Sequence, residues 1–300
     1  VSAVARGSTA AALARHGLRL ESEGRLLTAP VRVSEDPAAL GPQDLVVIAV
    51  KAPAMSAVAA GIAPLLGPDT VVLPAMNGVP WWFFHGFGGP CAGLRFESID
   101  PGGRISAAIP DRHVIGCVVH LACSMPEPGL ARHTTGDRLI IGEPSGAETP
   151  RVLALAGRLR AAGFDAPVSR RIQADIWYKL WGNMTTNPVS ALTGATADRI
   201  LDDPLVRRFC LAVMAEAAAI GARMGCPIAE SGEDRMEVTR RLGAFRTSML
   251  QDLEARRPPE IDALLTVVHE IGARIGVPTP NMDALLGLAR LQARTLGLYA

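Results

Sequence analysis

The chain has 300 residues, 49% of them apolar, and a formal net charge of +1 at pH 7. This length and apolar content are ample for two globular domains, and the balanced charge argues against a nucleic-acid or membrane-surface partner. The five cysteines are scattered without a CxxC pair, and the histidines form no ligand motif. We therefore expect free thiols in a reducing cytoplasm, and neither a disulfide framework nor a metal site.

Strand and helix patterns alternate in the first half. Leu45–Val50 is a continuous apolar run, typical of a central parallel strand covered on both faces. Ala54–Leu66 has the composition of a small-residue helix, and Lys51 and Pro53 interrupt the combined stretch, so that it is not a membrane span. Further elements are expected at Thr70–Ala75, His113–Leu121, Arg138–Ile141, Thr149–Ala162 and Ala166–Val168. The alternation predicts a doubly wound, Rossmann-like α/β domain over residues 1–169.

Helical periodicity dominates from about Arg170 onward, and strand signals disappear. The expected helices are Ile172–Leu192, Pro204–Met224, Asp234–Glu254, Glu260–Ile275 and Met282–Leu296. We therefore predict that an all-helical domain over residues 170–300 follows the sheet domain.

The first of these helices carries a polar stripe. Lys179, Asn183 and Asn187 recur at intervals of four residues, which places their side chains on one face. Such a stripe is more often solvated, but large apolar neighbours indicate a mostly buried helix, which Pro188 should bend or end. A buried lysine tends to have a lowered pKa, which suits a general acid near neutral pH. Buried amides need partners, and a ligand can be one.

Two polar residues follow predicted strands of the sheet domain. Lys51 comes directly after Leu45–Val50, and Asn77 follows Thr70–Ala75. In open α/β sheets, ligands bind at the carboxyl ends of the strands, so both residues are placed where a dinucleotide would lie. Asn77-Gly78 is also a common turn pair, and capping a turn is the alternative role for Asn77.

Two further segments complete a pattern with the stripe and with Met76-Asn77-Gly78. They are Ser248-Met249-Leu250-Gln251-Asp252 and Pro259-Glu260-Ile261-Asp262. Together these motifs resemble the ketopantoate reductase (2-dehydropantoate 2-reductase) family, and the resemblance covers nearly the whole chain. It implies NADPH-dependent reduction of a 2-oxo acid, with ketopantoate to pantoate on the route to coenzyme A as the leading reaction.

The resemblance also implies roles for individual residues. Lys179 would be the general acid, and Glu260 the carboxylate that orients the substrate or the lysine. Asn183, Asn187 and Ser248 would bind the substrate. Arg6 and Lys51 would contact NADP(H), and Asn77 would bridge cofactor and substrate. Without the family pattern, Glu260 is equally well explained as a charge that complements a helix N-terminus.

The sequence departs from the family at two places. It contains no G-x-G-x-x-G turn, and Val1–Arg6 resembles the second strand of the family, so a first βα unit of roughly 25–30 residues is expected to be missing. Weak or absent dinucleotide binding is therefore expected of these 300 residues. The aromatic run Trp81–Phe84 follows Asn77-Gly78, and these residues either line the substrate pocket or pack between the domains.

Two other interpretations stay open. The first is a related hydroxyacid or imine reductase, which Ser248 and Glu260 fit less well. The second is a non-catalytic binding or assembly protein that has lost half of its cofactor site. A small 2-oxo acid is the expected partner, and a homodimer is compatible with the sequence.

Overall fold

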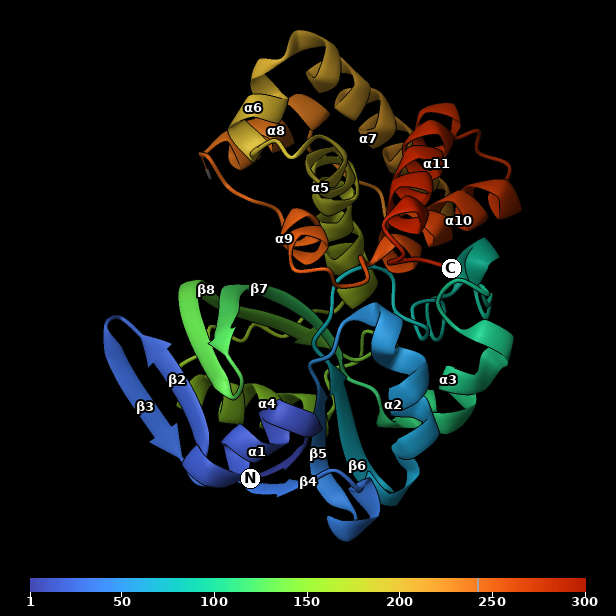
Figure 1. The fold of residues 1–300 in the computed structure, drawn as a ribbon. Helices are drawn as coiled ribbons and strands as arrows, with labels where there is room; N and C mark the ends of the chain where they lie inside the picture. Colours follow the sequence, from blue (N-terminus) through green and yellow to red (C-terminus); the bar gives the residue numbers. More distant parts are fainter. Residues whose placement is uncertain (242) are drawn as a thin grey trace.

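The computed structural model describes residues 1–241 and 243–300. Strands and four helices occupy the first part of the chain, and the helices of the second part gather on one side of the sheets (Figure 1). The last strand-like contact joins Ile141 to Val168, and the first long helix begins at Ile172. The α/β fold followed by a helical part agrees with the predicted fold class. The boundary between residues 169 and 170 stays a prediction.

The strands form three hydrogen-bonded groups. The groups are β1 (Ser2–Val4) with β4 (Arg32–Ser34), β5 (Gln43–Ile48) with β6 (Leu66–Pro74), and β3 (Arg25–Ala29), β2 (Leu18–Ser22), β8 (Leu130–Gly142) and β7 (Gly116–Glu127) in that order. The pairs β1–β4 and β5–β6 are parallel, whereas β7–β8 is an antiparallel hairpin. Ile115 N donates to Val72 O at 3.0 Å, which continues the surface from β6 towards β7.

The prediction that residues 45–50 are covered on both faces is wrong. The strand in this region is β5, and Val47 and Leu45 are 52% and 37% exposed. Among the described strands β5 pairs only with β6, so one of its edges has no strand partner. A continuous apolar run shows that a strand can be buried on both faces. It does not show that another strand or helix is present to bury it.

The helices of the sheet part are α1 (Gly7–His16), α2 (Met55–Gly61), α3 (Arg104–Ala108) and α4 (Pro150–Ala161). Helix α2 is shorter than expected, because a proline lies in the 3-10 turn at each of its ends. Thr149 caps α4 by accepting from Val152 N, and the apolar face of α4 packs under the β7–β8 side of the sheet.

The helical part contains α5 (Ile172–Thr193), α6 (Ala197–Asp202), α7 (Pro204–Met224), α8 (Gly232–Arg240), α9 (Ser248–Glu254), α10 (Val267–Ile275) and α11 (Pro280–Thr295). The single helix expected over Asp234–Glu254 is wrong, since Ser231 caps α8 and Thr247 caps α9 separately. A π-helical turn, η7 (Asp262–Thr266), precedes α10 within the range expected as one helix.

Helix α5 is the centre of the helical part. Trp177, Leu180, Trp181 and Met184 are each at most 2% exposed. The helix continues five residues beyond Pro188, so this proline does not end it, which was one of its two expected effects. Tertiary packing along a 22-residue buried helix outweighs the loss of one backbone donor.

The aromatic run Trp81–Phe84 is part of the core. All four side chains are at most 3% exposed, and the ring centroids of Phe83 and Trp177 lie 6.4 Å apart. A Cβ at Gly116 would lie 2.5 Å from the Trp82 ring, so this indole fits directly against strand β7. The packing interpretation therefore holds for Trp82, Phe83 and Phe84. No helix among the described residues is long and apolar enough to cross a bilayer.

Candidate active site

Lys179 connects the helical part to the sheet part. It projects from α5, and its ammonium donates to Asn77 Oδ1 at 2.7 Å and to the backbone oxygen of Val119 in β7. The flanking residues Trp177 and Leu180 are fully buried, which fixes the rotation of α5 and directs the lysine face towards the sheet. The amine of α5 therefore lies at the carboxyl end of β6, beside β7.

The environment of Lys179 changes its acidity. Desolvation lowers the pKa of the Lys179 amine to about 8, and Cys117 and Glu260 act in the opposite direction. Burial disfavours the charged form of an amine, which is the physical cause of the downward shift. A lysine with this pKa is mostly protonated at neutral pH and releases its proton more readily than an exposed one.

Asn77 is held in place by the turn that follows β6. Gly78 has φ +82°, and a Cβ there would lie 2.4 Å from the backbone oxygen of Ala263. Val79 N donates to the same oxygen at 2.9 Å. Only glycine allows this approach of the turn to η7. The Asn77 amide nitrogen has no acceptor among the described residues, so it is available to a ligand.

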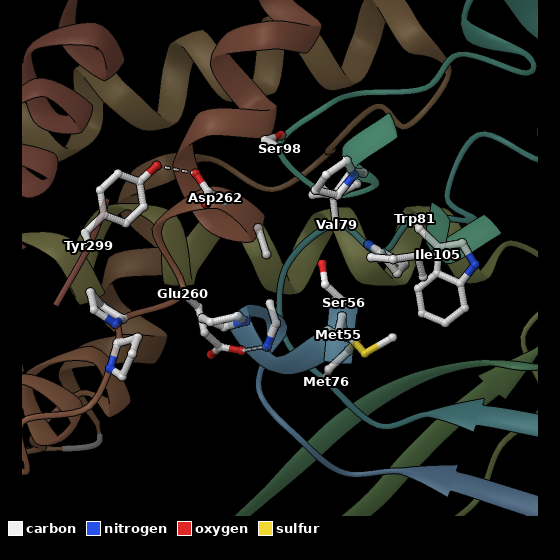
Figure 2. A pocket seen from close by; sticks show the side chains of 18 of the residues that line it. Met55, Ser56, Met76, Val79, Trp81, Ser98, Ile105, Glu260, Asp262 and Tyr299 are labelled. Carbon is white, nitrogen blue, oxygen red and sulfur yellow. Dashed lines mark hydrogen bonds between the residues drawn. The ribbon is translucent and has the colours of Figure 1, made fainter. Parts of the chain in front are cut away.

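Glu260 lies two residues before η7, and its side chain is turned towards the sheet part. It is 5% exposed, and Oε1 accepts from the backbone N–H of Ala52 at 3.2 Å (Figure 2). Burial raises the pKa of the Glu260 carboxyl, while Ala52, Lys51 and Lys179 lower it. The charges of Glu260 and Lys179 each favour the charged form of the other group.

Lys51 forms an ion pair across the two parts of the chain. It follows β5, and its ammonium binds the Asp252 carboxylate on α9. The Asp252 side chain is only 2% exposed, and Arg257 approaches its other oxygen at 3.2 Å. The sequence motif contained Asp252, but we assigned it no role. Its spacing of four from Ser248, which puts both on one face of α9, was the available signal.

The remaining substrate-binding candidates lie along α5 and at the start of α9. Asn187 is buried and donates to Ser248 Oγ at 3.5 Å. Asn183 is partly buried, and its side chain has no hydrogen bond among the described residues. Arg6 is an exposed N-cap of α1, and no described contact joins it to the residues above.

Glu260 also lines a pocket of about 360 Å³. Met55, Ser56 and Met76 approach it from the sheet part, and Asp262 and Tyr299 from the helical part (Figure 2). Tyr299 donates to Asp262 Oδ1 at 2.6 Å at its rim. Of the aromatic run, only Trp81 lines it. Glu260 lines this pocket, and Lys179 does not.

This geometry defines a class of protein. An amine from a helical domain reaches the carboxyl ends of parallel strands, beside buried amide and carboxylate groups, as in two-domain oxidoreductases that bind a dinucleotide at this edge. Lys51 and Asn77 lie at this edge and can hold such a cofactor, although no G-x-G-x-x-G turn occurs in the sequence.

Comparison with known proteins identifies the family. The models for ketopantoate reductase PanE/ApbA and for its C-terminal domain match residues 1–81 and 171–293. A 2-dehydropantoate 2-reductase of Mesorhizobium japonicum is 45% identical over all of this chain and 92% of its own length. The chain belongs to the ketopantoate reductase PanE/ApbA family, which implies a nicotinamide cofactor.

Solved structures agree with this assignment. A protein of Ralstonia solanacearum, provisionally described as a ketopantoate reductase, is 62% identical and superposes with a TM-score of 0.96 over 99% of this chain and 91% of its own. A D-mandelate dehydrogenase with NADH and anilino(oxo)acetate has a TM-score of 0.80 over 97% of this chain and 89% of its own, at 19% identity. The second likeness concerns the fold alone.

Proposed function

We propose that the protein is a cytoplasmic, NADPH-dependent 2-dehydropantoate 2-reductase that converts ketopantoate to pantoate. The observation that carries the proposal is the Lys179 amine, which contacts Asn77 at the carboxyl end of β6 and has a pKa lowered to about 8. The Mesorhizobium relative with this printed activity supports the choice of substrate.

The residues around the amine suit reduction of a ketone. Bound NADPH would supply the hydride. As the carbonyl carbon accepts it, the carbonyl oxygen gains negative charge, which the Lys179 ammonium stabilises before transferring its proton to that oxygen. The product is a hydroxyl group, and neutral Lys179 regains a proton from solvent. Asn77 Oδ1 holds the ammonium in position by accepting its hydrogen bond.

Further residues of the site would hold the substrate. Asn183 has free donors, and Asn187 and Ser248 form a weak mutual contact of 3.5 Å that a ligand can replace. Glu260 is the buried carboxylate next to this site, and Ala52 N–H fixes one of its oxygens. It can accept a hydrogen bond from a substrate hydroxyl or orient Lys179 through its charge.

The cofactor assignment rests on charge at the sheet edge. Lys51 and Asn77 follow β5 and β6, where a dinucleotide binds in open α/β sheets. We propose NADPH in preference to NADH because the fixed charge of exposed Arg6 after β1 suits a 2′-phosphate. A homodimer is compatible with the sequence, and a ketopantoate reductase of Staphylococcus aureus with the same fold is described as dimeric.

The proposal is tested by following NADPH oxidation by the full-length protein with a panel of 2-oxo acids, using ketopantoate, pyruvate, 2-oxoisovalerate and phenylglyoxylate. We expect kcat/KM to be highest for ketopantoate by at least tenfold. A preference for another 2-oxo acid would refute the substrate but keep the reaction class. The absence of any reduction with NADPH or NADH would refute the enzyme assignment.

A further inference from the structure

Arg235 lies against the helix that carries the reacting amine. It belongs to α8, and its guanidinium carbon is 5.3 Å from the centroid of the Tyr178 ring. A Cβ at Gly182 would lie 2.8 Å from Nη2 and 3.1 Å from Nε of Arg235. The guanidinium therefore rests on α5 between Tyr178 and Gly182, which directly precede Lys179 and Asn183 in the sequence.

Apart from the Tyr178 ring, the guanidinium has no partner among the described residues. Its Nε is buried without an acceptor, and no ion pair or side-chain hydrogen bond is formed by Arg235 in that part of the chain. Arg240 on the same helix, by contrast, pairs with Asp202 at 2.5 Å. Leaving a partly buried charge with five donors unpaired is unfavourable, and an anionic ligand would relieve this cost.

The contacts of Arg235 on α5 lie on either side of Lys179 in the sequence, since Tyr178 precedes Lys179 by one residue and Gly182 follows it by three. Desolvation, and after it the charges of Lys179, Arg138 and Arg235, lower the pKa of the His120 imidazole. His120 directly follows Val119, whose backbone oxygen accepts from Lys179. Of these cations, Arg138 is paired with Asp165 at 3.3 Å. Arg235 therefore adds an uncompensated positive charge close to the proposed site of reduction.

We propose that Arg235 is a specificity-determining residue that receives the carboxylate of the substrate while Lys179 contacts the carbonyl oxygen. The inference rests on the proposed function, because a 2-oxo acid presents both groups on adjacent carbon atoms. A guanidinium binds a carboxylate through two parallel hydrogen bonds, which neither an amide nor an ammonium reproduces. Gly182 contributes by leaving the surface of α5 open to the guanidinium.

The test uses two ketones, ketopantoate and its primary amide, which replaces the charged carboxylate by a neutral group of similar size. Both are assayed with Arg235→Met, Arg235→Lys and Gly182→Ala. Arg241→Met is the matched control, since Arg241 is exposed directly after the same helix. We expect Arg235→Met to raise KM for the acid by ~30-fold or more, the scale of a charged hydrogen-bond pair, with kcat changed only a few-fold. KM for the amide should stay within about twofold.

The other variants separate a substrate contact from a structural role. Arg235→Lys should give an intermediate KM for the acid, because lysine keeps the positive charge and cannot form the two parallel hydrogen bonds of a guanidinium. Gly182→Ala should displace the guanidinium and raise KM for the acid while the thermal midpoint stays near that of the wild type. If Arg235→Met changes acid and amide kinetics equally, or neither, the inference is overturned although the proposed function survives. A wild-type protein that reduces no 2-oxo acid overturns both.

Discussion

Lys179 Nζ and Asn77 Oδ1 are 2.7 Å apart although 102 residues separate them in the sequence. The bond joins the centre of α5 to the turn after β6, so neither part of the chain contains the site alone. The same seam includes the Lys51–Asp252 ion pair and the Ala52–Glu260 hydrogen bond. The relative placement of the two parts therefore determines the chemistry of the amine.

The pH dependence of the reaction follows from Lys179. Its pKa is lowered to about 8, and the amine can donate a proton only when it is protonated. The acid form is complete well below pH 8 and is lost above it, so kcat/KM for reduction should fall about tenfold per pH unit above pH 8. A kcat/KM profile measured from pH 6 to pH 10 checks this. A profile that stays flat up to pH 10 would assign the proton donor elsewhere.

Replacing Asn77 by aspartate should move that profile. A carboxylate at hydrogen-bond distance stabilises the charged form of the amine, which raises the pKa of Lys179. We expect the descending limb of kcat/KM to shift to higher pH by on the order of one unit. Asn77→Ala is the matched control, because it removes the hydrogen bond without adding a charge. A limb at the same pH in both variants and in the wild type would mean that the limb does not report Lys179.

The Lys51–Asp252 pair should respond asymmetrically to substitution. The Asp252 side chain is 2% exposed and that of Lys51 is 42% exposed. Lys51→Met leaves a buried carboxylate with Arg257 alone and should lower the free energy of unfolding by about 1–3 kcal/mol, a range that allows for screening at the exposed lysine. Asp252→Asn should cost less, because Lys51 can rehydrate. Urea unfolding of both single variants and the double variant measures this, and a larger loss in Asp252→Asn would contradict it.

Gly78→Ala should move the turn that carries Asn77 away from η7. Gly78 combines φ +82° with a Cβ position 2.4 Å from Ala263 O, so alanine adds a backbone clash to conformational strain. Gly24→Ala is the control, since Gly24 has φ +72° with nothing within 4 Å. We expect Gly24→Ala to lower stability by about 1 kcal/mol and Gly78→Ala by clearly more, with loss of activity. Equal thermal midpoints would show that the close approach to Ala263 is unimportant.

Local patterns were sufficient to predict much of the fold. The bounds of α7 agree with the prediction, because Pro204 and the capping residue Asp203 mark its start. Helix α5 begins at the predicted residue, because a long apolar stripe marks this helix. The polar stripe on α5 could also be predicted, because its residues recur at intervals of four. The roles of its three residues came from the resemblance and stay predictions.

Non-local features could not be predicted from the sequence. The separation of α8 from α9 depends on the cap Thr247, which lies inside the region of helical periodicity over Asp234–Glu254. The exposure of β5 depends on which strands lie beside it. The partner of Asp252 is Lys51, which is 201 positions away in the sequence. Arg235 was not singled out either, because its contact with Gly182 exists only after α8 packs on α5.

The most direct test of the central claim is the turnover of Lys179→Ala with saturating NADPH and ketopantoate, together with its thermal midpoint. Alanine suits a helix, so the fold should survive. The general-acid role predicts a kcat lower by ~10²-fold or more, with the descending limb near pH 8 removed from any residual activity. A folded Lys179→Ala protein with kcat within a few-fold of the wild type would contradict the assignment of Lys179 as the proton donor.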